Sequence, residues 1–329
     1  MKNRFSHTIV LLIIAASITC CNKPEKRRFV IVATTNIIGD AIKEIVKDNA
    51  SVEVLMGAGV DPHSYKATQG DMDKLTSADV VFYNGLHLEG KMADIFHKMS
   101  LHKHFYAVSD GLDKTDVLHD PKFEAAGADP HIWFDVSLWK KVVDYISKKL
   151  QELDPKEADY YKKNNDIYLH RLSTLHETIK QLLKNIPKEQ RVLISAHDAF
   201  NYFGKIYEVE VKGLQGISTV SECGLKDITD LVKFIIKRNI KALFLETSVP
   251  EGPMQAVVEG CKRQGYIVIV GGHLYSDSLG QESLPEGTYC GMMLKNAITI
   301  ANSLNFGMEV INFDEIFRTF NEMTHATNR

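Results

Sequence analysis

The feature that most constrains the fold is residues 156–186, a stretch between Pro155 and Pro187 that contains neither proline nor glycine. At ~1.5 Å per residue, a continuous helix of this length would extend ~45 Å, about the length of a domain. Two helices with an unmarked break are the alternative. The prediction of one helix rests on aliphatic residues at spacings of three and four, which form a single apolar stripe: Leu172, Leu175, Ile179, Leu182 and Ile186.

On both sides of this stretch, short apolar runs alternate with segments of helical periodicity. Such alternation is typical of βαβ units, in which parallel strands form a sheet covered by helices. We therefore predict an α/β fold of two lobes, residues 29–155 and 187–329, each with a mainly parallel sheet flanked by helices, bridged by one long helix over residues 156–186. The expected strands are residues 29–33, 52–55, 80–83, 105–108, 192–195, 210–212, 242–246 and 267–270. The expected helices besides the long one are residues 38–46, 68–77, 88–99, 225–238, 254–264 and 289–304.

The N-terminus has the pattern of a secretory signal. A positively charged start precedes an apolar run over residues 8–18, which is too short to span a bilayer. The following Ile18-Thr19-Cys20-Cys21 is similar to a bacterial lipobox. We predict a lipoprotein signal peptide over residues 1–20, a lipidated Cys21 that anchors the protein to the membrane, and a tether over residues 21–28. A conventional signal peptide cleaved near Ala16 is the alternative.

Charge and cysteine usage exclude several classes of protein. The 329 residues carry a formal net charge of −3 and contain no long basic block, which argues against nucleic acid as a partner. Beyond the N-terminus the cysteines are Cys223, Cys261 and Cys290, an odd number without close spacing. This is neither a disulfide framework nor a CxxC metal site. We interpret these cysteines as buried small apolar residues, although one bridge among them is possible.

Four segments have a similar form, in which an apolar or small-residue run leads into a loop with a residue type that binds metals. His63 and His131 each follow Asp-Pro, His197 follows a strand at the start of an expected helix, and Asp277 follows a strand through a Gly271-Gly272 turn. Ligands of α/β proteins bind at the carboxyl ends of strands. Three imidazoles and one carboxylate complete a four-coordinate set for a divalent cation. We predict that these four side chains meet in the cleft between the lobes.

The residue types also limit which metal can bind. In each Asp-Pro-His, the proline fixes its own φ and favours an extended residue before it, which should give the imidazole a stiff loop. Three nitrogens and one carboxylate suit Zn(II), and Mn(II) or Fe(II) would also be held if Asp277 binds through both oxygens.

A histidine ligand usually donates its other ring N–H to an acceptor. Glu246, at the end of a strand, is the candidate acceptor, and an ordinary solvated carboxylate is the alternative. His273, near Asp277, is the rival for a place in the set.

Together, the motifs of this chain resemble the bacterial ABC-transporter solute-binding lipoproteins that capture zinc or manganese (cluster A-I), and most closely the treponemal zinc/manganese-binding type. The resemblance implies two lobes joined by a rigid helix, with the metal at their interface and ligands at His63, His131, His197 and Asp277. It further implies a binding protein, not an enzyme, that is lipid-anchored in the periplasm or on the cell surface and serves an ABC permease and its ATPase. We also expect a monomer. The matching segments are Val60–His63, Tyr83–Glu89, Asp129–Asp135, His197–Phe200, Lys212–Gly216 and Glu286–Tyr289.

Two departures from the family pattern leave the choice between zinc and manganese open. Zinc-dedicated members carry a long His- and acid-rich loop between the first two ligands, and nothing between His87 and Asp129 has that density. Manganese-dedicated members tend to place Glu where this chain has His197.

Two alternative functions come from other classes of protein: a zinc hydrolase and a surface adhesin. A catalytic zinc needs an open coordination position and a general base, whereas four protein ligands would fill the shell here. No repeat or stalk supports an adhesin.

Overall fold

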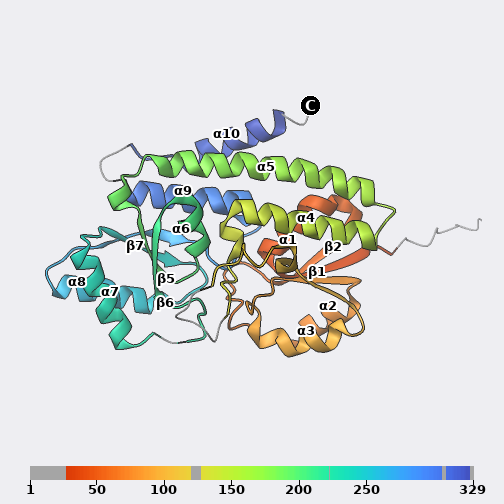
Figure 1. Ribbon diagram of the computed structural model, residues 1–329, viewed down its shortest axis with the longest axis horizontal. Coiled ribbons are helices and arrows are strands. Elements are labelled where there is room, and N and C mark those ends of the chain that lie inside the picture. The colour runs from red at the N-terminus through yellow and green to blue at the C-terminus, as the bar shows by residue number, and fades with distance from the viewer. Residues whose placement is uncertain (1–26, 120–126, 222, 306–308, 327–329) are drawn as a thin grey trace, which may run out of the picture.

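The computed structural model describes residues 27–119, 127–221, 223–305 and 309–326 (Figure 1). The expected signal peptide over residues 1–20 and the expected lipidation site Cys21 lie outside the described residues, as does most of the expected tether. Within the described ranges, no helix combines the length and the apolar character needed to cross a membrane.

The first lobe contains a four-stranded parallel sheet in the order β2-β1-β3-β4. Helices cover both faces, so central strand residues such as Ile31, Val32 and Ala33 are fully buried. Helices α1 and α4 lie on one face, and α2 and α3 on the other (Figure 1). The elements are β1 (Phe29–Thr35), α1 (Asn36–Val46), β2 (Ala50–Met56), α2 (Gln69–Ser77), β3 (Val80–Tyr83), α3 (Ala93–Ser100), β4 (His104–Ala107) and α4 (Val136–Leu153).

The second lobe contains two parallel strand pairs, β5-β6 and β7-β8, with β5 and β7 side by side. Helices α7 and α8 pack on one face of these strands, and α6 and α9 pack on the other. The predicted fold class, parallel sheets flanked by helices in two lobes, is therefore confirmed. The elements are β5 (Val192–His197), α6 (Asn201–Tyr207), β6 (Glu210–Gln215), α7 (Leu225–Lys237), β7 (Ala242–Glu246), α8 (Gly252–Arg263), β8 (Ile269–Leu274), α9 (Tyr289–Leu304) and α10 (Phe313–Ala326).

Helix α5 (Ala158–Lys184) is continuous, so the alternative of two helices is wrong. It lies along α1 and α4 of the first lobe and along α9 and α10 of the second (Figure 1). Leu172, Leu175 and Ile179, which form part of the apolar stripe of this helix, are fully buried. One rigid element therefore packs on both lobes, and its stripe belongs to the same apolar core as the helices on either side.

Several local expectations are wrong, including the helix expected over residues 88–99, which begins at Ala93. His197 is the last residue of β5, and the helix expected to start there begins at Asn201. The expected Gly271-Gly272 turn is part of β8, whose pairing with β7 shifts register at this point, so the two glycines form a β-bulge. A Cβ on Gly271 would come within 2.9 Å of the Phe244 ring, which is why this close approach needs glycine. Cys223 is half-buried, whereas Cys261 and Cys290 are buried as expected.

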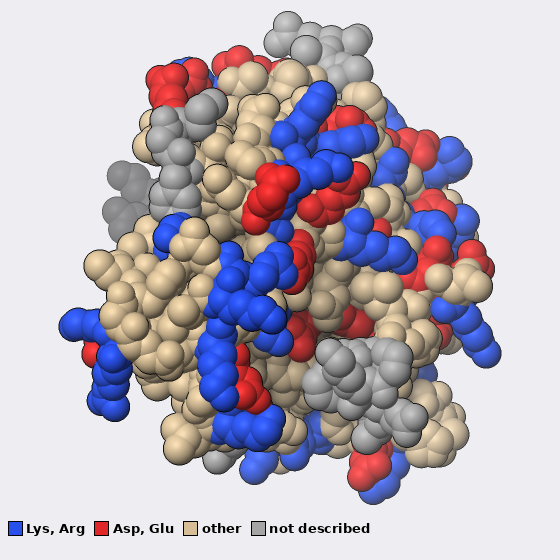
Figure 2. Space-filling view, turned by 60° about the vertical axis from the view of Figure 1, so that its left-hand side comes forward, with Lys and Arg blue, Asp and Glu red and all other residues tan. Residues whose placement is uncertain are grey.

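The surface charge of the second lobe is mixed. Figure 2 turns this lobe forward and shows basic side chains with acidic ones among them. Several are ion-paired: Arg238 lies 2.7 Å from Glu210, and Lys226 lies 2.7 Å from Asp230. Exposed pairs of this kind contribute little to stability, but they compensate the charge locally.

Candidate metal centre

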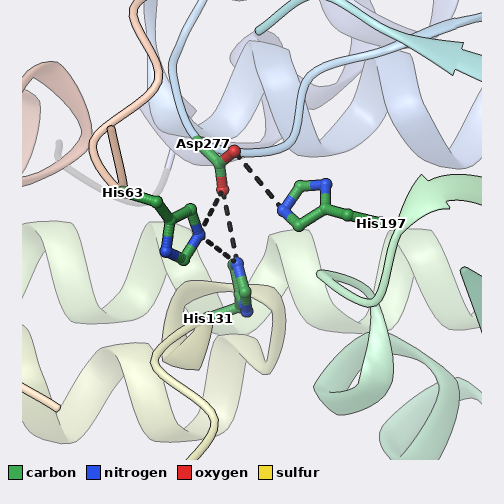
Figure 3. A group of neighbouring side chains, drawn as sticks. All are labelled: His63, His131, His197 and Asp277. Atoms are coloured by element: carbon green, nitrogen blue, oxygen red, sulfur yellow. Dashed lines mark hydrogen bonds and ion pairs between the residues drawn. The ribbon is translucent and has the colours of Figure 1, made fainter. Parts of the chain in front are cut away.

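The structure brings His63, His131, His197 and Asp277 together at the interface of the two lobes (Figure 3). Each offers one ligand atom, and these atoms all lie within 4.8 Å of one another. His63 lies on the loop after β2, and His131 comes just before α4. His197 ends β5, and Asp277 lies on the loop after β8. All four are buried, with at most 4% of their surface exposed. Two residues come from each lobe, so the cluster exists only while the lobes are packed together.

The ring nitrogens and the carboxylate face a common point. The Nε2 atoms of His63 and His131 lie 3.3 Å apart. Asp277 Oδ1 is 3.4 Å from His131 Nε2 and 4.0 Å from His63 Nε2, while Oδ2 is 3.4 Å from His197 Nε2. Within the described part of the chain, His197 Nε2 and Asp277 Oδ1 are buried without a hydrogen-bond partner. Buried polar atoms nearly always have a partner, and a cation at this point would satisfy both.

Two further carboxylates orient the imidazoles from behind. Asp129 Oδ1 lies 2.7 Å from His131 Nδ1 and also accepts a hydrogen bond from the His131 backbone N–H at 3.0 Å. Glu246 Oε2 lies 2.6 Å from His197 Nδ1, and Oε1 accepts from the His197 backbone N–H at 3.0 Å. Each carboxylate therefore favours the proton on Nδ1 and leaves Nε2 available as a ligand. Sequence reasoning named Glu246 but missed Asp129, although the Asp-Pro-His motif contains it.

The first Asp-Pro-His motif uses its aspartate differently. Asp61 Oδ1 accepts a hydrogen bond from the His63 backbone N–H at 2.9 Å, as Asp129 does for His131. Its Oδ2 accepts from Ser64 Oγ at 2.8 Å and from Thr219 Oγ1 at 2.7 Å. Thr219 belongs to the second lobe, so Asp61 fixes the loop of His63 and also joins the lobes.

The loop of His131 rests on the segment from Tyr83 to Glu89. Asn84 Nδ2 donates to the carbonyl oxygen of Pro130 at 3.0 Å, one residue before the ligand. Residues 85–87 all have positive φ, which is unusual for the non-glycine residues among them. The buried Glu89 closes this turn by accepting a hydrogen bond from the Asn84 backbone N–H at 2.7 Å. The segment from Tyr83 to Glu89 therefore supports the loop of His131 and does not itself join the cluster.

The rival histidine lies elsewhere. His273 is an exposed residue of β8, and its Nε2 lies 2.9 Å from Glu251 Oε1. Within the described residues, no other group of three or more potential ligand residues comes together as this one does.

Burial and charge set the protonation of the cluster. Burial lowers the pKa of His63 to about 4, so this ring is neutral at pH 7. Burial also opposes the charged form of His197, but Glu246 and Asp277 outweigh it and raise the pKa well above its usual range. Asp129 and Asp277 likewise raise the pKa of His131. Burial would raise the pKa of Asp277, yet the surrounding histidines, His197 foremost, hold it well below the usual range. The carboxylate is therefore ionised, and the raised pKa values of His131 and His197 favour protons on these rings when no cation is bound.

Comparisons with known proteins show which family the chain belongs to. The family model of the zinc-uptake complex component A, periplasmic, matches residues 31–303. The manganese-binding lipoprotein MntA of Bacillus subtilis is 45% identical over 282 residues, which cover 86% of this chain and 92% of MntA. The zinc-binding protein TroA of Treponema pallidum is 40% identical over 274 residues, 83% of this chain and 88% of TroA. The solved structure of periplasmic TroA has a TM-score of 0.82 at 39% identity and covers 84% of this chain and 99% of its own. Since the match runs through both lobes and α5, the chain belongs to the family of periplasmic zinc-uptake complex component A.

Proposed function

We propose that this protein is the metal-binding lipoprotein of an ABC importer, which captures Zn(II) or Mn(II) outside the cytoplasm and delivers it to the permease and its ATPase. The observation that carries the proposal is the convergence of three imidazoles and one carboxylate at a single buried point. The two relatives differ in the metal that they are named for, manganese for MntA and zinc for TroA. The comparisons support neither a hydrolase nor an adhesin.

In this proposal, His63, His131 and His197 bind the ion through Nε2, and Asp277 binds it through its carboxylate. Glu246 and Asp129 hold the rings of His197 and His131 in place. Zn(II) accepts four such ligands in a tetrahedral arrangement. Mn(II) or Fe(II) would also be held if Asp277 offers both oxygens, although the Irving–Williams order favours zinc over manganese at equal supply.

We further propose that residues 1–20 are removed and that lipidated Cys21, followed by a tether to residue 28, keeps a monomeric protein near its permease. Residues 29–155 and 187–329 would be the two lobes, and residues 156–186 would link them. Mass spectrometry of the N-terminal peptide from membranes tests the anchor. Acyl groups on Cys21 are the expected result, and an unmodified N-terminus near residue 17 would contradict it.

Competition titration of the metal-free protein with Zn(II) and Mn(II) tests the proposed function. We expect one ion per chain. We also expect His197→Ala and Asp277→Ala each to weaken binding by more than about 100-fold, since even the loss of a residue that only orients a ligand costs about 10- to 100-fold. The exposed His273 provides the control, and His273→Ala should bind as the unmodified protein does. Equal binding by all three variants would contradict the proposal.

A further inference from the structure

The two oxygens of Asp277 have different surroundings. Oδ1 faces the Nε2 atoms of His63 and His131, and no side chain from outside the cluster is hydrogen-bonded to it among the described residues (Figure 3). Oδ2 faces His197 and also accepts a hydrogen bond from Ser248 Oγ at 3.2 Å. Ser248 follows the end of β7 and belongs to none of the sequence motifs. Oδ1 is therefore contacted only by residues of the cluster, whereas Oδ2 is also hydrogen-bonded from outside it.

The pairing of β7 with β8 fixes the position of Ser248. Glu246 and Leu274 are partners in the register, and the Thr247 backbone N–H donates to the Leu274 carbonyl oxygen at 3.0 Å. The two strands thus place Ser248 opposite Ser276, and their Oγ atoms lie 2.9 Å apart. The backbone that carries the donor is therefore held beside the paired strand ends.

Ser276 is in turn held by the first lobe. It is fully buried, and its carbonyl oxygen accepts a hydrogen bond from Trp133 Nε1 at 2.9 Å. Trp133 lies two residues after His131 in the 3-10 helix η5 (Ile132–Phe134). The chain of contacts from Trp133 through Ser276 to Ser248 therefore ties the orientation of Asp277 to the loop that carries a ligand of the other lobe.

We propose that Ser248 is a positioning residue that determines metal specificity, because its hydrogen bond favours coordination through Oδ1 alone. A donor on Oδ2 occupies a lone pair of that oxygen and draws charge from it, so Oδ2 becomes the poorer ligand. One oxygen with three nitrogens gives the four-coordinate shell that suits Zn(II). Both oxygens would give the larger, more oxygen-rich shell that suits Mn(II). The inference rests on the proposed function, since it assumes that the four residues bind the ion.

Competition titration of Ser248→Ala against Zn(II) and Mn(II) tests this inference. The ratio of Mn(II) affinity to Zn(II) affinity should rise by about 10-fold, which is within the change in metal affinity caused by mutating a residue that is hydrogen-bonded to a ligand. Ser248→Thr keeps the hydroxyl and should restore the original ratio. Ser278→Ala is the matched control, because Ser278 Oγ accepts a hydrogen bond from the Gly59 backbone N–H at 2.9 Å instead of donating to Asp277.

The visible spectrum of the Co(II)-loaded protein reports coordination number independently of affinity. Four-coordinate Co(II) absorbs strongly in the visible range and higher coordination absorbs weakly, so Ser248→Ala should lose intensity, whereas Ser248→Thr and Ser278→Ala should not. An equal loss of affinity for both metals with an unchanged spectrum would mean that Ser248 only stabilises the fold, and would overturn the inference alone. If the unmodified protein bound neither metal, the proposed function would fail, and the inference would fail with it.

Discussion

At the residue scale, the proposed metal centre depends on two carboxylates that lie behind the histidine rings and do not face the proposed ion position. Asp129 and Glu246 each lie within 2.7 Å of a histidine Nδ1 and fix which nitrogen is protonated. Asp129→Asn and Glu246→Gln keep the size of the side chain but remove its charge. We expect each to weaken Zn(II) binding by about 10- to 100-fold, measured by competition titration. Glu251→Gln is the matched control, since Glu251 pairs with the exposed His273 outside the cluster. Unchanged affinity in the first two variants would show that these contacts do not orient the ligands.

The pKa values of His197 and His131 predict how metal binding depends on pH. The pKa of His197 is raised well above its usual range and that of His131 is raised, so the metal-free site carries protons that an incoming ion must displace. Apparent affinity should therefore rise as pH increases towards the pKa of these rings. Calorimetry at pH 7 in two buffers of different ionisation enthalpy measures the protons released. We expect at least one per ion bound, and none would contradict the assignment.

The sequence was informative about these residues for a specific reason. His63 and His131 could be predicted from their Asp-Pro-His motifs, and His197 and Asp277 from their positions after apolar strands. The contact of Asp129 with His131 Nδ1 arises because the Asp-Pro-His segment turns back on itself, and the effect of proline on φ alone does not predict this turn. The contact of Ser248 with Asp277 depends on the register of β7 and β8, which no local pattern specifies.

At the element scale, the strands of the βαβ units were predicted well because their apolar runs are short and bounded. Helix α4 was not predicted, although it has a clear signal: the side chain of Asp135 accepts from the Ser137 and Leu138 backbone N–H groups and begins it. Helix α10 was missed as well. The bulge at Gly271-Gly272 could not be distinguished from a turn, since both need glycine and the difference lies in the partner strand.

Asp40 connects three helices, its own α1 with α5 and α9, and we expect it to make the stability of the protein depend on pH. Its Oδ2 accepts from the Tyr289 backbone N–H, the first residue of α9, at 3.0 Å and from Tyr168 Oη of α5 at 3.5 Å. Burial, with a smaller effect of Glu44, raises the pKa of Asp40 from 3.8 to about 7. The folded protein thus holds a proton that the unfolded chain has lost, so the stability from this group is complete below pH 3.8 and is lost as pH rises to about 7.

Asp40→Asn should remove that dependence, because the amide still accepts a hydrogen bond and never ionises. The difference in Tm between the variant and the unmodified metal-free protein should therefore favour the variant more at pH 8 than at pH 5. Thermal unfolding followed by circular dichroism at the two pH values measures it. A difference that is the same at both pH values would contradict the raised pKa.

At the scale of the whole molecule, the packing limits how far the lobes can separate. Helix α5 lies along both of them, and hydrogen bonds cross the interface beside the ligands, such as Tyr202 Oη to the Asp129 carbonyl oxygen at 3.0 Å. We expect metal capture to involve small tilts and loop ordering. Small-angle scattering should therefore give the same radius of gyration with and without metal. A clear contraction on binding would mean that the lobes close like a hinge.

The most direct test of the metal centre is a crystal structure of the protein loaded with one equivalent of Zn(II) or Mn(II), with the ion located by anomalous scattering at its own absorption edge. The proposal predicts a single strong peak bonded to Nε2 of His63, His131 and His197 and to the carboxylate of Asp277. A peak bonded to other residues, with none among these four side chains, would contradict it.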